Sequence, residues 1–269
     1  MNVTGKDLLI IIPAFNEENT IRSTINGLVS AGITETADIL IINDASKDRT
    51  KEIVESMGVP CVTHVYNLGY GAGLHTGYKY AVNHGYEYII QMDADGQHDV
   101  KNIPVIYSAL KSEVDGQKPD IVLGSRFMDS ESEYDAGLLK NIAFVWFRFI
   151  IKLITGKKIM DPTTGLQGLS RSAFGFYSGY NHFDDRYPDA NMILQMLLLG
   201  FSINQVPAVM HKRAYGKSMH SGIIKPVVYM MRMTLQLFSV LVRERLLKID
   251  VKEAERFLSE PEISEEVKI

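Results

Sequence analysis

Two acidic residues separated by one position are the strongest chemical feature of the sequence. Asp93 and Asp95 follow an apolar run and precede Gly96, in the stretch DADGQH. Acids at positions i and i+2 of a turn can both reach one hard divalent cation. Mg²⁺ or Mn²⁺ prefers oxygen ligands and leaves positions free for phosphate oxygens, so it would neutralise a diphosphate leaving group. The alternative is an acidic turn that caps a helix, because Asp and Gly are common turn residues.

A third acid and a glycine-rich segment follow other apolar runs. Asp44 stands at the end of an apolar run, where its carboxylate would accept hydrogen bonds from a nucleobase or from ribose hydroxyls. The alternative is that it caps the next helix. Residues 67–73 read NLGYGAG, which looks like a phosphate-binding turn. The glycines lack the GxGxxG spacing, and the Walker pattern GxxxxGK(S/T) is absent, so P-loop chemistry is not expected. Close packing of the glycines is the alternative to phosphate binding.

The first half of the chain alternates apolar strands with helices. Strands are expected at 8–12, 37–44, 60–66 and 86–95, and helices from about 17 to 31, after Ser46 as N-cap, and after the glycine-rich turn. Continuous apolar strands separated by helices predict an α/β fold with a mostly parallel sheet covered on both faces. Ligands of such folds bind beyond the carboxyl ends of the strands. The residues expected at those ends are Glu17, Asp44, Asn67, Asp93 and Asp95.

The second half is more apolar and more basic. Expected elements are a strand at 120–127, an apolar helix at 138–155, a helix near 189–199, a strand near 201–206 and an apolar, basic helix at 223–248. Between the last two lies the basic segment HKRAYGKSMHSG (211–222). The acidic tail from Lys252 is expected to fray in solvent.

Composition excludes several classes of protein. The 269 residues carry a net charge of −4, so nucleic acid is not an expected partner. One cysteine, Cys61, excludes an internal disulfide and a cysteine-rich zinc site. No signal peptide is expected, because the first apolar run breaks at Pro13, and no uncharged stretch reaches the roughly 20 residues of a membrane-spanning helix. Histidines other than His98 are expected to be surface or packing residues.

Six motifs in a fixed order are far more specific than any one of them. Together they resemble family 2 of the glycosyltransferases, which has the GT-A fold, and within it the polyprenyl-phosphate glycosyltransferases, the group that includes dolichol-phosphate mannosyltransferase. The resemblance covers residues from about 8 to 221. The motifs are PAFNEE (13–18), INDASKDRT (42–50), NLGYGAG (67–73), DADGQH (93–98), GSRF (124–127) and DPTTGLQG (161–168).

The resemblance implies a role for individual residues toward a nucleotide-sugar donor. Pro13, Phe15 and Glu17 would line the nucleoside pocket, with Asp44 on the base or ribose. Asp93 and Asp95 would hold Mg²⁺ or Mn²⁺ and the diphosphate, with Gln97 as a further metal contact. The residues implied to clamp the donor diphosphate from a mobile loop are Arg213, Lys217 and Ser218.

The acceptor side departs from the family pattern. Arg126, in GSRF, would bind the acceptor phosphate, since Arg offers a planar fork for phosphate oxygens. A second arginine is common near position 140, where this chain has Lys140. Gln167 stands where the family often has an arginine. The QxxRW motif of processive polysaccharide synthases is absent, which disfavours polymerisation.

Two segments have the pattern of interfacial helices. In 138–155 the cations Lys140, Arg148 and Lys152 fall within an arc of roughly 120°, and the remainder is apolar. In 223–248 the cations Lys225, Arg232 and Arg243 share one stripe, and Pro226 fits a first helical turn. Such helices lie in a membrane interface with their cations at anionic head groups. Core helices with snorkelling cations are the alternative.

Three functions are compatible with these features. The first is an inverting, metal-dependent transfer of a sugar to a polyprenyl phosphate, which needs no strong base, for assembly of cell-surface polysaccharide. The second is transfer to a sugar hydroxyl, which needs a general base, with Asp189 and Asp161 as candidates. The third is a non-catalytic scaffold on the same fold.

The first function implies a place in the cell and a domain plan. We expect a GT-A domain at 1–222, an amphipathic membrane-interface helix at 223–250 and an acidic tail at 251–269. The protein would be cytoplasmic and peripheral on the inner face of the membrane. A second copy of the chain or a membrane protein is a further partner compatible with this plan.

Overall fold

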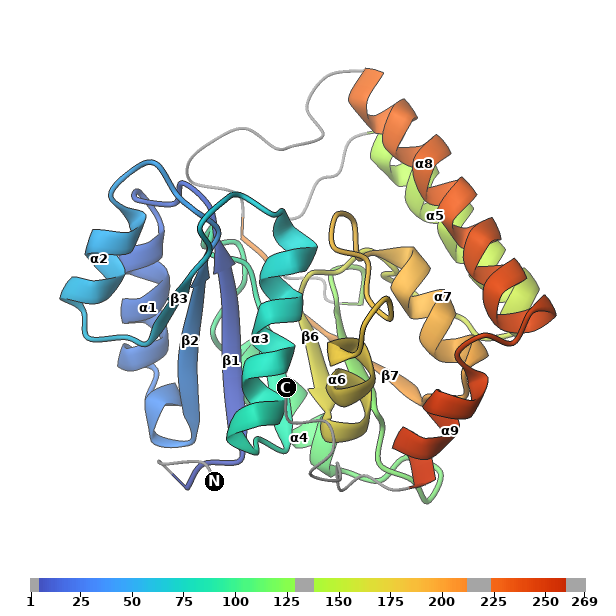
Figure 1. Cartoon of the computed structure of the whole chain (residues 1–269), viewed down its shortest axis with the longest axis horizontal. Coiled ribbons are helices and arrows are strands. Elements are labelled where there is room, and N and C mark those ends of the chain that lie inside the picture. The colour runs from blue at the N-terminus through green and yellow to red at the C-terminus, as the bar shows by residue number, and fades with distance from the viewer. Residues whose placement is uncertain (1–4, 129–137, 212–223, 260–269) are drawn as a thin grey trace.

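The computed structural model describes residues 5–128, 138–211 and 224–259 of the chain. Figure 1 shows a central sheet with helices around it. The strands are β1 (Leu8–Ala14), β2 (Ala37–Asn43), β3 (Cys61–Thr63), β4 (Tyr88–Gln91), β5 (Ile121–Ser125), β6 (Gln167–Ser170) and β7 (Ile203–Pro207). The helices are α1 (Ile21–Ser30), α2 (Thr50–Ser56), α3 (Tyr70–His84), α4 (Asn102–Lys111), α5 (Leu138–Thr155), α6 (Arg171–Ser178), α7 (Ala190–Leu198), α8 (Ile224–Val240) and α9 (Val251–Ser259). A 3₁₀ turn spans Ile33–Glu35, and a π-helix, Leu241–Leu246, continues α8.

The sheet has the order β3-β2-β1-β4-β6-β5-β7 and is mostly parallel, as expected. The exception is β6, which pairs antiparallel with both β4 and β5. No strand was expected at residues 167–170, so β6 adds an element to the expected sheet. The GT-A fold class is confirmed by this mixed sheet with helices on both faces.

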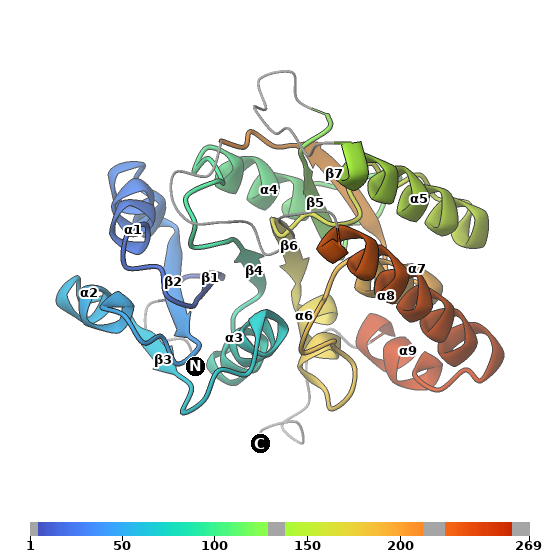
Figure 2. The same cartoon turned by 90° about the horizontal axis from the view of Figure 1, so that it is seen from above.

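Each face of the sheet is covered because the strands are apolar throughout. In β1, Leu9 and Ile11 face one hydrophobic cluster, and Leu8, Ile10 and Ile12 face the other. Figure 2 shows α1 and α4 on one side of the sheet and α3 and α6 on the other. Burial on both sides explains the continuous apolar runs, and it fixes which strand ends face solvent.

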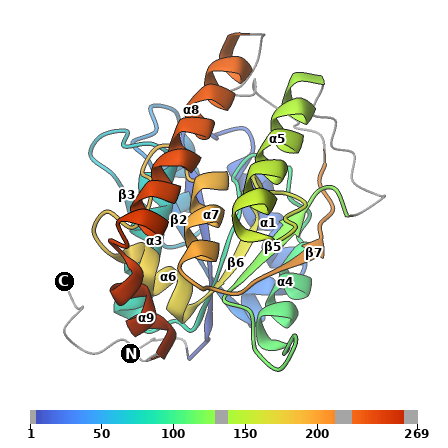
Figure 3. The ribbon, with the colours of Figure 1, turned by 90° about the vertical axis from the view of Figure 1, so that its right-hand side faces the viewer.

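A pair of long helices, α5 and α8, lies side by side at one flank (Figures 1 and 3). The indole Nε1 of Trp146 donates to Thr234 Oγ1 at 3.0 Å. The ring of Phe147 packs edge-on against that of Tyr229. Outward-facing side chains of the pair are large, apolar and exposed, and we call them the apolar face: Ile142, Val145, Trp146, Phe149 and Leu153 on α5, and Val228, Met231, Leu235 and Phe238 on α8.

The cations of these helices do not all line an exposed stripe. Arg148 is half-buried, with its guanidinium carbon 4.3 Å from the centre of the Phe127 ring. Arg243 lies in the π-helix and pairs with Asp250 at 2.5 Å. Both arginines are partly buried and contact other protein groups, and their contact with lipid head groups stays a prediction. The side chains of Lys140 and Lys225 lie outside the described part of the chain.

The chain after α8 folds back and packs against α6. In α9, Ala254 and Phe257 are buried, and the Phe257 ring packs edge-on against Phe176 of α6. The expected solvated tail is thus wrong for residues 252–259, because the two apolar side chains give this acidic helix a face to bury. Within the described residues, no helix combines the length and apolar character required to cross a bilayer.

Candidate active site

The acidic turn lies directly beyond the carboxyl end of β4. Two side chains hold Asp93: the Tyr70 hydroxyl, from the start of α3, donates to Oδ1 at 2.9 Å, and Nε2 of His98, in the same motif, lies 3.2 Å from Oδ2. Burial and the neighbouring carboxylate raise the pKa of Tyr70 well above its usual value, so the phenol stays a donor. Asp95 is buried, and its Oδ1 accepts the N–H of Gln97 at 3.0 Å. Both carboxylates are therefore fixed in position.

A glycine on the β6 side makes room for this turn. A Cβ atom at Gly165 would lie 3.0 Å from Asp93 Oδ2 and 3.2 Å from the Tyr70 hydroxyl. Any side chain there would push against the acid. The motif DPTTGLQG thus places a glycine, with no side chain, beside Asp93.

The donor atoms of the turn fit a hard divalent cation. Two carboxylates on one turn are enough for Mg²⁺, which usually completes its shell with water and substrate phosphates. Gln97 donates its side-chain N–H to the carbonyl of His211 at 3.2 Å, and its part as a metal contact stays a prediction. No group of three or more His, Cys, Asp or Glu suited to a metal occurs within the described ranges.

Asp44 organises the neighbouring loop at the end of β2. Its Oδ1 accepts the N–H of Leu68 at 2.8 Å and lies 2.8 Å from His64 Nδ1, while Oδ2 accepts the N–H of Gly69 at 2.8 Å. His64 is also 2.8 Å from Thr76 Oγ1 through its other nitrogen. The carboxylate thus fixes the entry to α3. Its contact with a base or ribose stays a prediction.

The loops after β1 and β2 are joined to each other. The N–H of Glu17 donates to Thr50 Oγ1 at 2.8 Å, and the Glu17 carboxylate accepts the Thr20 hydroxyl at 2.6 Å. Ser46 Oγ accepts the N–H of Asn16 instead of capping α2, so the expected cap is wrong. Asp48 Oδ1 instead accepts the N–H of Thr50, the first residue of α2.

The expected nucleoside pocket residues differ in exposure. Pro13 is buried at the end of β1, where it packs against α3 at Gly73. Phe15 is 42% exposed just beyond the strand. An exposed ring at a strand end offers a flat apolar surface for a base.

The glycine-rich turn is shaped by a distant loop. A Cβ at Gly71 would lie 2.1 Å from the carbonyl oxygen of Asp184, and the N–H of Ala72 donates to the carbonyl of Asp185 at 3.0 Å. Close approach of two backbones therefore explains Gly71. At least one N–H group in the first turn of α3 donates to another part of the protein. At that position this favours close packing of the glycines over phosphate binding.

Arg126 forms a buried ion pair. Its Nε and Nη2 donate to the two oxygens of Asp161 at 2.6 and 2.5 Å, and Nη2 also donates to Thr163 Oγ1 at 2.8 Å. The Asp161 side chain has no exposed surface. Asp161 is therefore unsuited to be a base, because both of its oxygens hold a guanidinium. Binding of an acceptor phosphate by Arg126 stays a prediction.

Asp189 lies at the start of α7 and faces the same region. The Tyr229 hydroxyl of α8 donates to its Oδ2 at 2.7 Å. Burial raises the pKa of Asp189 to about 6, and the Asp93 carboxylate adds to the rise while Tyr229 and Arg126 oppose it. That Asp189, Asp93 and Arg126 act in one site stays a prediction.

Four expected residues cannot be placed. Arg213, Lys217 and Ser218 lie outside the described residues, as does the side chain of Lys140. The structure adds groups to which the sequence pattern gave no role: Tyr70, His64 and Tyr229. No local signal marks them, because each contacts a carboxylate from a different part of the chain.

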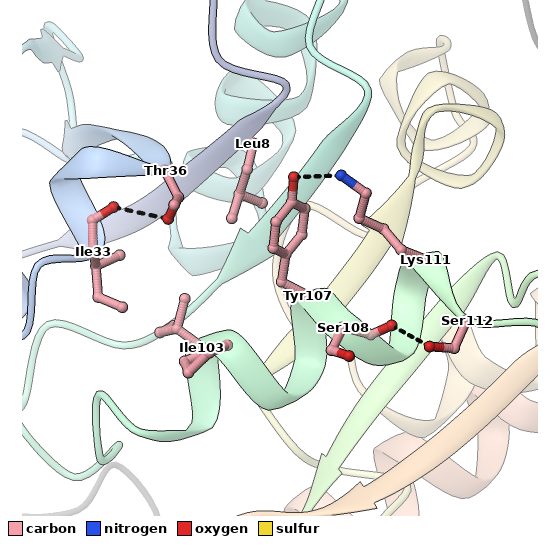
Figure 4. Close-up of a pocket in the computed structure, with 9 residues that line it drawn as sticks. Leu8, Ile33, Thr36, Ile103, Tyr107, Ser108, Lys111 and Ser112 are labelled. Carbon is pink, nitrogen blue, oxygen red and sulfur yellow. Dashed lines mark hydrogen bonds between the residues drawn. The ribbon is translucent and has the colours of Figure 1, made fainter.

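A surface crevice of about 350 Å³ lies elsewhere (Figure 4). It is lined by Leu8 at the amino end of β1 and by Ile103, Tyr107 and Lys111 of α4. In Figure 4 the Lys111 ammonium group points at the Tyr107 hydroxyl, 2.9 Å away. The crevice is at the opposite end of the strands from Asp93 and Asp95, so it is not the site described above.

Comparison with known proteins identifies the family. Residues 9–177 match the description Glycosyl transferase family 2. The chain belongs to this family. The matched range includes Asp44, Asp93, Asp95 and Arg126.

Several relatives of this glycosyltransferase have similar lengths. An uncharacterized protein of Methanocaldococcus jannaschii is 29% identical over 88% of this chain and 95% of its own. The UDP-N-acetylglucosamine–dolichyl-phosphate N-acetylglucosaminyltransferase of Methanococcus voltae is 28% identical over 64% of this chain and 72% of its own. The undecaprenyl-phosphate mannosyltransferase of Micrococcus luteus is 23% identical over 80% and 88%. Its relatives thus include enzymes that act on dolichyl and polyprenyl phosphates.

A solved structure supports the fold. Glucosyl-3-phosphoglycerate synthase from Mycobacterium tuberculosis superposes with a TM-score of 0.62 at 17% identity, covering 89% of this chain and 78% of that one. At this identity the likeness concerns the fold alone.

Proposed function

We propose that this glycosyltransferase moves a sugar from a nucleotide-sugar, UDP- or GDP-linked, to a polyprenyl phosphate at a membrane surface, for assembly of cell-surface polysaccharide. One observation carries the proposal: α5 and α8, the helices that present the apolar face, contact the charged residues through their inner side. Tyr229 of α8 donates to Asp189, and the Arg126 guanidinium carbon lies 5.3 Å from the centre of the Phe144 ring of α5. A lipid lying on this face would bring its phosphate group to that site.

The location and domain plan belong to the same proposal. The protein would be peripheral on the cytoplasmic face of the membrane, with residues 223–250 at the interface. Exposed apolar patches of this kind mark membrane or protein contact sites. The named relatives that act on dolichyl and undecaprenyl phosphates support a lipid acceptor.

Asp93 and Asp95 would hold the metal in the reaction. A bound Mg²⁺ or Mn²⁺ supplies charge neutralisation for the departing nucleoside diphosphate. The solved neighbour named above is described with Mn²⁺ and UDP, which supports this choice of ion. Tyr70 and His98 keep the Asp93 oxygens in place, so the acids do not reorganise when the donor binds.

The displacement itself requires no base. An anionic oxygen of the acceptor phosphate forms a bond to the anomeric carbon as the bond from that carbon to the diphosphate oxygen breaks. The diphosphate leaves with the electron pair, and the configuration inverts. The main contribution of the protein is then to position the acceptor phosphate and the donor diphosphate with cationic groups. Arg126, Arg213 and Lys217 are the cations that we assign to this role.

A hydroxyl acceptor is the second candidate. It is favoured by one observation, the raised pKa of Asp189, because a carboxyl with a pKa of about 6 is suited to take a proton near neutral pH. In that reaction Asp189 would remove the hydroxyl proton of a saccharide.

A transfer assay separates these functions. The full chain is incubated with Mg²⁺ or Mn²⁺ and labelled UDP- and GDP-sugars, with a polyprenyl phosphate in vesicles and a saccharide acceptor both present, and then extracted into organic solvent. Label in the organic phase that EDTA abolishes supports the proposal. Label that reaches only a saccharide acceptor contradicts it in favour of the second candidate.

The metal acids are tested by Asp95→Asn. We expect a loss of transfer of at least about 100-fold with an unchanged fold, because the substitution removes a charged ligand but keeps the shape. The exposed Asp115→Asn is the matched control, since Asn tolerates the positive φ of 54° found there. Full activity of Asp95→Asn would rule out the metal assignment.

A further inference from the structure

Two buried N–H donors of Arg148 have no hydrogen-bond acceptor among the described residues. This arginine lies on α5 and is half-buried. Its Nε and Nη2 atoms are buried without a hydrogen-bond partner in the described part of the chain. A buried charged group without a partner is costly, and native proteins rarely keep one. Donors of this kind point to a ligand that accepts from them.

Among the described residues, the groups around Arg148 carry an excess of positive charge. Its guanidinium carbon lies 4.3 Å from the centre of the Phe127 ring, and that of Arg126 lies 5.8 Å from the same ring. Asp161 favours the charged form of Arg148, but both oxygens of this acid accept from Arg126. Two guanidinium groups therefore share one carboxylate. Burial, with a contribution from Arg126, lowers the pKa of Arg148.

We infer that Arg148 binds the phosphate monoester of the acceptor, an inference that rests on the proposed function. A guanidinium presents a planar fork that matches phosphate oxygens, and a phosphate dianion would satisfy its donors and the excess charge together. Arg126 is already paired through Nε and Nη2, so Arg148 is the arginine of the two with donors available at those atoms.

The position of Arg148 on α5 also suits a lipid phosphate. The neighbouring residues Val145 and Phe149 of the same helix belong to the apolar face. A molecule with an apolar chain and a terminal phosphate can therefore contact the exposed face with its chain and turn its phosphate inward along one helix. The nucleotide diphosphate, by contrast, belongs with Asp93 and Asp95 at the end of β4.

Binding is tested with short, water-soluble probes. Titration calorimetry of the full chain with citronellyl phosphate is compared with titration of citronellol, which has the same chain without the phosphate. We expect Arg148→Gln to lower the affinity for citronellyl phosphate by at least about tenfold, because a charge-assisted hydrogen bond is lost. Arg148→Lys is expected to lower this affinity less. Affinity for the nucleotide-sugar is expected to change by less than about twofold, because the donor contacts other groups.

Lys152 provides the matched control. It is an exposed cation one turn further along α5. Lys152→Gln removes the same charge from the same helix and is expected to leave the affinity for citronellyl phosphate unchanged. Equal weakening by both substitutions would mean a general electrostatic effect and would overturn the inference. Loss of binding to anionic vesicles with unchanged affinity for citronellyl phosphate would point to a lipid head group and would overturn it too.

Stability distinguishes a binding role from a structural one. Arg148→Met removes the unpartnered donors and keeps an unbranched apolar stem, so its Tm without ligand is expected to equal or exceed that of the wild type. A structural arginine would give a lower Tm. If the wild type binds citronellyl phosphate through Arg148 but transfers no sugar to it, the proposed function fails and this inference stands. If it transfers sugar equally well with and without Arg148, the inference alone fails.

Discussion

Asp93 depends on two other side chains for its orientation, one from α3 and one from its own motif. The Tyr70 hydroxyl contacts one oxygen and His98 contacts the other. Partners of this kind fix the direction of a metal-binding carboxylate, and their loss typically costs about 10- to 100-fold in metal affinity or activity. Tyr70 also begins α3, so the glycine-rich turn and the acidic turn are linked through a single hydrogen bond.

We expect Tyr70→Phe to raise the Mn²⁺ concentration needed for half-maximal activity by about tenfold, since the ring stays but the donor is lost. Electron paramagnetic resonance of Mn²⁺ in the presence of UDP measures the same affinity without turnover. Tyr80→Phe, further along the same helix, is the control. An unchanged Mn²⁺ affinity in Tyr70→Phe would show that the hydrogen bond does not position Asp93.

The pH dependence at Asp189 separates the two acceptor classes. With a phosphate acceptor, the decline of the rate at low pH follows the second ionisation of the phosphate, near about pH 6, and Asp189→Asn keeps it. We expect this variant to lose less than about tenfold in kcat, against the roughly 100- to 10,000-fold typical of a lost general base. Loss of the acidic limb together with most of the activity would instead favour a saccharide hydroxyl.

The elements that carry long apolar runs follow from the sequence. The strand β1 and the helix α5 match the expected ranges within two residues, because burial on both faces or an apolar stripe leaves a strong periodic pattern. The strand β6 was not predicted. Its four residues, QGLS, include a glycine and two polar side chains, and its antiparallel pairing depends on β4 and β5 far away in the chain.

The acids of the candidate site were predicted from the sequence, but their hydrogen-bond partners were not. The acids at strand ends were found because a strand end is a local signal: Asp93 and Asp95 follow β4, and Asp44 follows β2. Their supporting partners were not found. Tyr229 is 40 residues from Asp189 in the chain, and Tyr70 is 23 residues from Asp93, so only the tertiary fold brings each pair together.

The π-helix after α8 contains a second group with a displaced pKa. Glu244 is buried, and burial together with the Asp250 carboxylate raises its pKa to about 7. Its folded pKa exceeds the unfolded value of about 4.5, so the native state binds more protons than the unfolded state between these values. The free energy of unfolding therefore falls as the pH rises from about 4.5 to 7.

Glu244→Gln tests this element. We expect a Tm at pH 8 at least about 2 °C above that of the wild type, because the neutral amide avoids an unfavourable buried charge. At about pH 5 the two proteins should differ little. The control is Glu255→Gln on the exposed side of α9, which is expected to change the Tm at neither pH. A lower Tm for Glu244→Gln at the higher pH would show that its pairing with Arg243 outweighs the cost of burial.

At the scale of the whole molecule, the catalytic edge of the sheet and the apolar face form one unit. The polar side of α8 is used within the protein: Tyr229 donates to Asp189, and Gln236 donates to Asp184 at 2.6 Å. Asp184 and Asp185 in turn lie against the glycine-rich turn. Since the polar side is engaged in this way, the apolar side is left facing outward, where a membrane can cover it.

The double substitution Phe149→Ser and Leu235→Ser tests that arrangement. Burial of a Phe or Leu side chain contributes about 1.5–3 kcal/mol, so loss of both should weaken binding to vesicles by at least about 100-fold in a sedimentation assay. Both side chains are exposed, at 55% and 69%, and their removal should leave the Tm nearly unchanged. Val29→Ser with Val105→Ser, on α1 and α4, removes exposed apolar side chains elsewhere and serves as the control. Transfer to citronellyl phosphate in solution should persist in the Phe149→Ser, Leu235→Ser variant. Transfer to a long-chain polyprenyl phosphate in vesicles should decrease, because the variant binds the vesicles more weakly. Equal loss of transfer with both acceptors would mean that these residues act within the site and not on the membrane.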